Sequence, residues 1–163
     1  MLRPELEPNL SFVENIFLEV VAAISLFDIG FDDHDKQKMQ EAVSQINFLT
    51  NGTISEEDLY EYWAAEDIKS LAFRLSLPIP DSVGDLSRNE LLEIIARIRA
   101  DGINGVSEKL VQMGLLFYDL KSEFYIPLLE RHYSHPAIYS LFGTTLTDEE
   151  IADAIVSHKA IQL

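Results

Sequence analysis

The chain has 163 residues, 47% of them hydrophobic and 10% aromatic, which is enough apolar surface for one soluble globular domain and excludes intrinsic disorder for most of its length. It contains no cysteine, which excludes a disulfide framework, a thiolate nucleophile and a cysteine-ligated metal site. Its 28 acidic and 12 basic side chains give a net charge of −16 at pH 7, so the chain repels nucleic acid and anionic lipid and attracts basic partners.

Two helices are predicted near the N-terminus. Apolar residues at three- and four-residue spacing predict a helix over residues 11–27, with Ser11 and Glu14 as a capping box and Gly30 closing the helix. A second helix is predicted over residues 32–47, because an acidic cluster at its start suits the positive end of a helix dipole. That cluster consists of Asp32, Asp33 and Asp35.

A third helix, in one piece or two, is predicted over residues 55–75. It follows the turn signal Asn51–Gly52 and ends before Pro78. Two prolines and a glycine within residues 78–85 then predict an extended linker, which is the best internal boundary in the chain. The charge is uneven across this boundary, because residues 1–83 hold 16 acidic and only 5 basic side chains.

The C-terminal part is also predicted to be helical. Ser87 and Glu90 form a capping box that starts a helix over residues 88–100. Its periodicity places Leu91, Ile94, Ile95 and Ile98 inside, with Arg88, Glu93, Arg97 and Arg99 largely outside. Further helices are predicted over residues 105–114, 126–133 and 136–142, and a last one from Thr147 through Val156. The patterns together predict a mainly α, single-domain bundle of about six to eight helices over residues 1–163.

Residues 88–127 resemble the helix–turn–helix and β-wing of winged-helix domains. Two predicted helices and a turn lead into GLLFYDLKSEFYIP, which either continues as helix or forms a two-stranded hairpin near residues 115–126. Lys109 and Lys121 are the only cations on the second helix and the wing, too few to neutralise phosphates. The resemblance therefore implies a regulator or adaptor that contacts another protein rather than DNA.

One stretch is similar to part of a calcium loop. Residues Asn47–Asp58 match the back half of an EF-hand loop, with Gly52 at the sixth position. Leu49 and Asp58, however, stand where the loop needs an oxygen ligand and a bidentate glutamate. The favoured interpretation is an Asn–Gly turn that leads into a helix capped by Ser55, without tight calcium binding.

No other pattern completes a metal or catalytic site. Four possible metal ligands stand consecutively at Asp32, Asp33, His34 and Asp35, but they point in different directions on a helix and are interpreted as a solvated first turn. His132 and His135 have a spacing that suits zinc, but no second ligand cluster accompanies them. Because the chain also lacks a nucleophile elbow and a P-loop, the sequence predicts no catalytic residue, no metal and no cofactor.

The strongest candidate for a binding site is an aromatic and acidic segment. Aromatic anchors ringed by carboxylates suit an interface with a basic partner, since the rings supply buried area and the carboxylates supply steering. The alternative is that Trp63 and one tyrosine belong to the core and the acids form a solvated face. The candidate residues are Glu56, Glu57, Asp58, Tyr60, Glu61, Trp63, Glu66 and Asp67.

The function predicted from these features is that of a non-enzymatic acidic binding protein that inhibits or neutralises a basic protein, for example a nuclease toxin. In size, charge and helical character the chain is similar to bacterial immunity proteins and to DNA-mimicking inhibitors. The alternative is a winged-helix-like regulator or adaptor that acts through residues 88–127. Acidic residues interrupt the apolar stretches and the N-terminus lacks a signal-peptide pattern, so the expected location is cytoplasmic, without a membrane segment.

Overall fold

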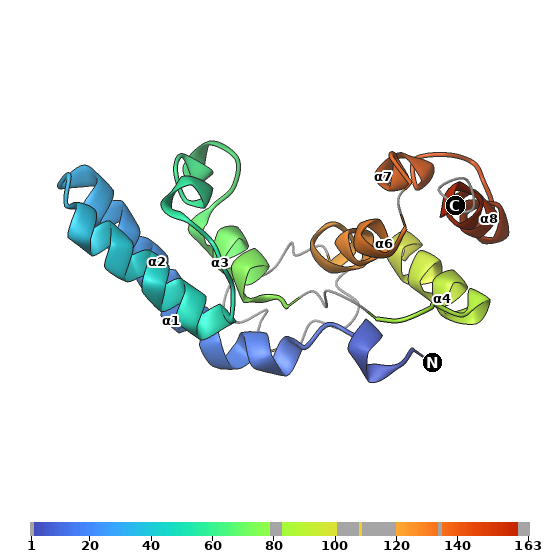
Figure 1. Cartoon of the computed structure of the whole chain (residues 1–163), viewed down its shortest axis with the longest axis horizontal. Coiled ribbons are helices and arrows are strands. Elements are labelled where there is room, and N and C mark those ends of the chain that lie inside the picture. The colour runs from blue at the N-terminus through green and yellow to red at the C-terminus, as the bar shows by residue number, and fades with distance from the viewer. Residues whose placement is uncertain (1, 79–82, 101–107, 109–119, 134, 160–163) are drawn as a thin grey trace. The chain divides into compact units, whose positions relative to one another are not determined.

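The computed structural model describes residues 2–78, 83–100, 108, 120–133 and 135–159 (Figure 1). The fold is mainly helical, as predicted, and the described residues contain no strand. Contacts group the chain into two compact units, each described below on its own. Unit 1 comprises residues 1–8, 79–105 and 119–163, and unit 2 comprises residues 9–78 and 106–118.

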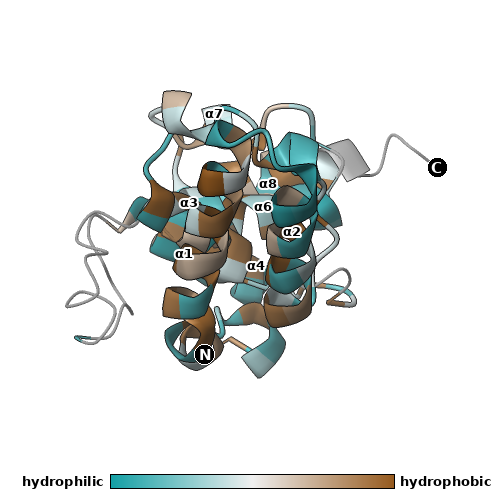
Figure 2. Cartoon of the chain, turned by 90° about the vertical axis from the view of Figure 1, so that its left-hand side faces the viewer, coloured by the Kyte–Doolittle hydropathy of each residue, from teal (hydrophilic) through white to brown (hydrophobic). Residues whose placement is uncertain are grey.

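Unit 2 is built on three α-helices that pack against one another. They are α1 (Leu10–Asp32), α2 (Lys36–Thr50) and α3 (Ile68–Ser76). Helices α1 and α2 run side by side (Figure 1), joined by a tight turn. The core is apolar, with Phe17, Phe27 and Phe73 among its largest fully buried side chains. Figure 2 shows brown, hydrophobic residues along α1 and teal, hydrophilic residues along α2, in line with the larger number of buried residues on α1.

Helix α1 is longer at both ends than the sequence predicts. It starts at Leu10 because the side chain of Asn9 accepts a hydrogen bond from the backbone N–H of Phe12, in place of the predicted capping box. It also continues through Gly30, which was expected to close it. A Cβ at Gly30 would lie 3.0 Å from both Cγ and the backbone nitrogen of Met39, so the glycine permits close packing of α1 on α2.

Helix α1 bears on the expectation that the chain has no membrane segment, although Glu14, Glu19 and Asp28 interrupt its apolar sequence. It is the one described helix that is long and apolar enough, by length and composition, to cross a membrane. A third of its most apolar 18-residue window is buried inside the protein. Val13, Phe17 and Phe27 are among its buried side chains, and the helix packs against α2 and α3.

Helix α2 begins four residues later than predicted. Asp35 supplies the cap, because its side chain accepts a hydrogen bond from the backbone N–H of Lys38 at 3.1 Å. Asp32 instead ends α1. Between the two helices His34 takes a left-handed conformation, with φ of 56°. At the far end, Asn51 (φ 54°) caps α2 in the left-handed region, as expected for the predicted turn.

The predicted helix over residues 55–75 is only partly correct. Its second piece is α3, which Asp67 caps, but the first piece is two short 3₁₀ turns, η2 (Glu56–Asp58) and η3 (Tyr62–Ala64). Glu61 separates these turns, because its φ of 58° lies outside the helical region. The segment is therefore a tight irregular loop, which exposes side chains that a continuous helix would bury.

Unit 1 contains four α-helices in its described residues: α4 (Arg88–Arg99), α6 (Ile126–His132), α7 (Ile138–Leu141) and α8 (Asp148–Lys159). Helix α4 agrees with the prediction, since its capping box forms and its four predicted core residues are buried. Glu93 and Arg97 are half-buried rather than largely outside. Arg97 donates to the carboxylate of Glu7 at 2.5 and 2.9 Å and to the hydroxyl of Tyr125 at 2.8 Å, which ties the N-terminal turn η1 (Pro4–Leu6) to α4.

The hairpin considered near residues 115–126 does not form where the structure describes that segment. Lys121–Tyr125 is a short π-helix, η4, that continues directly into α6. Phe124, Tyr125 and Ile126 are buried consecutively, whereas a strand would bury every second residue. The described residues 120–126 therefore do not form the second strand of a wing. The predicted helix over residues 105–114 lies outside the described residues except for residue 108.

Candidate functional site: an aromatic and acidic surface

Five aromatic side chains form a connected cluster in unit 2, here called the aromatic cluster. Phe31 is its centre, with ring centroids 5.8 Å from Tyr60 and 5.5 Å from Trp63. Tyr60 also contacts Phe27, and Tyr62 meets Trp63 edge to face at 5.7 Å. These distances suit favourable tilted and edge-to-face ring pairs. The cluster therefore joins the end of α1 to η3 and the residues before it.

Tyr62 anchors the loop to α1 through a polar contact. Its hydroxyl donates to Asp28 Oδ2 at 2.7 Å, while Asp28 Oδ1 is buried and has no hydrogen-bond partner among the described residues. Burial raises the pKa of Asp28, and the charge of Asp32 adds to the effect, although the bond from Tyr62 opposes it. Burial, followed by the bond to Asp28, raises the pKa of Tyr62 strongly, so the phenol stays protonated and remains the donor.

The other two aromatic residues of the loop lie at the surface. Trp63 is 51% exposed and Tyr60 is 41% exposed, whereas Tyr62 is 9% exposed. The alternative in which Trp63 belongs to the core is therefore wrong, and Tyr62 is the tyrosine that packs inside. Large aromatic side chains held at the surface by other rings are typical of binding surfaces.

Three of the six predicted carboxylates are used to build the loop itself. Asp58 accepts from the backbone N–H and the hydroxyl of Ser55, the first of which lowers its pKa most. Asp67 caps α3, and Glu66 pairs with Arg74 at 2.5 Å. These contacts explain the local concentration of acids without any partner.

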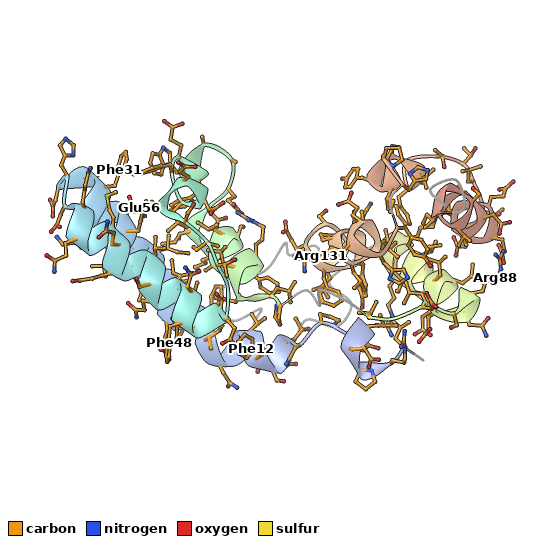
Figure 3. The ribbon with its side chains drawn as sticks, viewed as in Figure 1. Phe12, Phe31, Phe48, Glu56, Arg88 and Arg131 are labelled. Atoms are coloured by element: carbon orange, nitrogen blue, oxygen red, sulfur yellow. The ribbon has the colours of Figure 1, made fainter. Side chains whose placement is uncertain are left out.

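The remaining three carboxylates face outward around the aromatic cluster. Glu56 accepts a hydrogen bond from the hydroxyl of Tyr60 at 3.2 Å. Glu57 and Glu61 are exposed, and their side-chain carboxylates make no hydrogen bond or ion pair with described residues. Figure 3 shows Phe31 and Glu56 on neighbouring elements at the same end of α1. A surface that combines rings with unpaired carboxylates is chemically suited to bind cations and apolar groups together.

A pocket of about 410 Å³ opens beside the cluster. Its walls come from the end of α1, the start of α2 and the loop, a combination that sequence reasoning missed except for Tyr60 and Glu61. The i, i+4 spacing of Phe27 and Phe31 was the only signal for an aromatic contribution from α1. The lining residues are Phe31, His34, Lys36, Met39, Tyr60 and Glu61.

The stretch with calcium-loop similarity has a structural role. The Asn47 side chain donates to the carbonyl of Ile54 and accepts from its N–H, both at 2.8 Å, which closes the loop after α2.

Of the two histidines whose spacing suits zinc, His135 accepts a hydrogen bond at Nδ1 from the N–H of Ala137 in unit 1. Among the residues that the structure describes, no group of three or more His, Cys, Asp or Glu side chains is placed to hold a metal ion.

No protein-family model matches this chain, and neither a curated protein nor a solved structure shows significant similarity to it. The function must therefore be argued from the geometry and charge of the site.

Proposed function

We propose that this protein is a non-enzymatic acidic binding protein, which inhibits or neutralises a basic protein by engaging it through the aromatic cluster and the carboxylates around it. A single observation carries the proposal. Trp63 and Tyr60 are held half-exposed by ring contacts, next to carboxylates that the fold does not use.

The energetics of interfaces support this assignment. Trp and Tyr are enriched among the few residues that dominate binding energy, because they bury a large area at a low cost in conformational entropy. Ring contacts to Phe31 already restrict both side chains, so little ordering remains to be done on binding. The aromatic cluster therefore supplies the affinity in this proposal.

The charge of unit 2 supports a basic partner. Residues 9–78 hold 13 acidic and 4 basic side chains, and two of those four cations are paired within the unit, Lys38 with Asp33 and Arg74 with Glu66. The resulting negative potential accelerates encounter with a basic surface and opposes a phosphate backbone. A nuclease toxin, whose nucleic-acid site is basic, is a partner of this chemistry.

The test begins with a photo-crosslinking amino acid placed at position 63 in cells that carry the gene naturally. Position 139, where exposed Tyr139 lies in unit 1, is the matched control. We expect a crosslinked protein that is basic and specific to position 63. An acidic protein, a nucleic acid or equal labelling from both positions contradicts the proposal.

The second part measures association rates of the crosslinked protein by stopped flow at several salt concentrations. The double substitution Glu57→Gln with Glu61→Asn should lower the association rate constant several-fold and change dissociation less. The control Glu130→Gln with Glu149→Gln makes the same change in charge at exposed sites in unit 1 and should have the smaller effect. Association that does not depend on salt refutes electrostatic steering.

A further inference from the structure

The pocket beside the aromatic cluster has no role in the proposal so far. We propose that it receives a large apolar side chain of the basic partner, while lysine or arginine residues flanking that side chain pair with Glu61 of the lining and with the exposed Glu57, whose charge acts on Tyr60. This inference rests on the proposed function and names the chemistry of the segment that is recognised: a basic peptide segment with an apolar anchor.

The walls of the pocket favour an apolar occupant. Phe31, Met39 and Tyr60 contribute two rings and a thioether. Methionine adapts its shape to an inserted group and makes favourable contacts with aromatic rings. The volume of about 410 Å³ is near the lower end of the range for binding pockets, so it suits one or two side chains rather than a larger ligand.

The charges of the pocket separate the anchor from its flanking residues. Lys36, His34 and Glu61 all belong to the lining of the pocket. The positive charge of Lys36 would repel a cationic group in the pocket, which disfavours lysine or arginine as the anchor. Cations that remain outside meet Glu61 and the neighbouring Glu57, neither of which pairs with a described residue.

The backbone around the pocket is fixed in an unusual conformation. His34 and Glu61, on opposite segments of the lining, both have positive φ, at 56° and 58°. Non-glycine residues adopt this region at a cost in backbone strain, and such strain clusters at functional sites. Both the backbone N–H and Nδ1 of His34 lie within 3.2 Å of the carbonyl of Phe31, which holds the turn in place. A preformed pocket loses little entropy when an anchor enters.

The experiment uses the full chain and three synthetic lysine-rich peptides of 15 residues that lack tryptophan. They differ at a single central position, which is leucine, alanine or arginine. Dissociation constants are measured by calorimetry at low salt, and the emission of Trp63, the only tryptophan, reports whether binding occurs at this surface. We expect the leucine peptide to bind at least about tenfold more tightly than the other two.

Two substitutions locate the effect. Phe31→Ala removes a wall of the pocket and should abolish the preference for leucine. Phe48→Ala is the matched control, because Phe48 is 83% exposed at the other end of the α1–α2 pair (Figure 3). Glu61→Asn is the second test variant, since asparagine tolerates positive φ and removes only the charge. It should weaken all three peptides and keep the leucine preference.

Each outcome decides between the two proposals. Equal, salt-sensitive binding of all three peptides overturns the pocket inference and leaves the proposed function standing. Tighter binding of the arginine peptide also overturns the pocket inference, because the group bound at this surface is then a cation stacked on the aromatic rings. A leucine preference that survives Phe31→Ala places the anchor elsewhere and also overturns the inference. No binding of any peptide at low salt overturns both proposals.

Discussion

The contact between Tyr62 and Asp28 should be the polar contact that holds the aromatic loop on α1. Tyr62→Phe removes the hydroxyl and keeps the ring. This substitution breaks the 2.7 Å hydrogen bond from Tyr62 to the carboxylate of Asp28. Hydrogen bonds to charged groups contribute about 1.5–3 kcal/mol to the free energy of unfolding. Asp28 Oδ1 has no partner in the part of the chain that the structure describes, so Asp28 loses the one side-chain hydrogen bond that it makes there. We expect a loss of about 2 kcal/mol in the free energy of unfolding at pH 7.

A double-mutant cycle with Asp28→Asn isolates the charged part of this contact. A neutral hydrogen bond contributes about 1 kcal/mol, so Tyr62→Phe should cost about half as much in the Asp28→Asn background. Urea unfolding followed by the emission of Trp63 measures all four variants, since Trp63 contacts Tyr62 directly. Tyr139→Phe, at an exposed tyrosine of unit 1, is the control and should change stability by less than about 0.5 kcal/mol.

The pH dependence of the cycle follows from the raised pKa of Asp28. The folded state binds the proton of this carboxyl more tightly than the unfolded state, so its contribution to stability falls as pH rises from the ordinary carboxyl pKa through the raised one. Asp28→Asn should remove that fall, and the cost of Tyr62→Phe should shrink as pH is lowered from 7 towards 4. Additivity within about 0.3 kcal/mol, or a cost that does not change with pH, refutes the reasoning.

Two further predictions concern the packing of α1 and the loop after α2. Gly30→Ala should destabilise the protein by about 1–3 kcal/mol in the same urea assay, because the new methyl group meets the backbone of Met39 at 3.0 Å; an unchanged midpoint contradicts the close packing. Calorimetric titration with Ca²⁺ should detect no dissociation constant at or below about 10⁻⁵ M, since the Asn47 amide oxygen already bonds to the backbone of Ile54; a value in that range disproves the structural role of the loop.

The helices were predictable where their start signals and their apolar stripes agree. Helix α4 has both a Ser87–Glu90 capping box and a buried stripe, and its observed bounds match the predicted ones closely. Gly30 misled the prediction of α1 because a glycine that ends a helix and a glycine that permits close packing look identical in sequence. The sequence did not predict that the helix expected over residues 55–75 is interrupted at Glu61, because glutamate has no preference for positive φ.

Only those residues of the candidate site that lie close together in the sequence were predictable. The exposed rings and carboxylates of residues 56–67 follow one another in the chain, so their composition revealed them. Phe31, His34 and Met39 reach the same surface from about 20–30 residues earlier. Their arrival depends on how α1 packs on α2, which is a tertiary effect that no local pattern encodes.

Net charge alone does not distinguish the carboxylates of this segment that the fold uses from those that it leaves unpaired. Asp58, Glu66 and Asp67 are the acids that the fold uses, as a capping partner, an ion pair and a helix cap. Acids of this kind are satisfied before any partner arrives and contribute little to recognition. Glu57 and Glu61 differ from them because the fold leaves their charge unpaired among the described residues. The paired acids therefore fix the backbone of the loop, and the unpaired acids of the same loop are the ones that the proposed partner would meet.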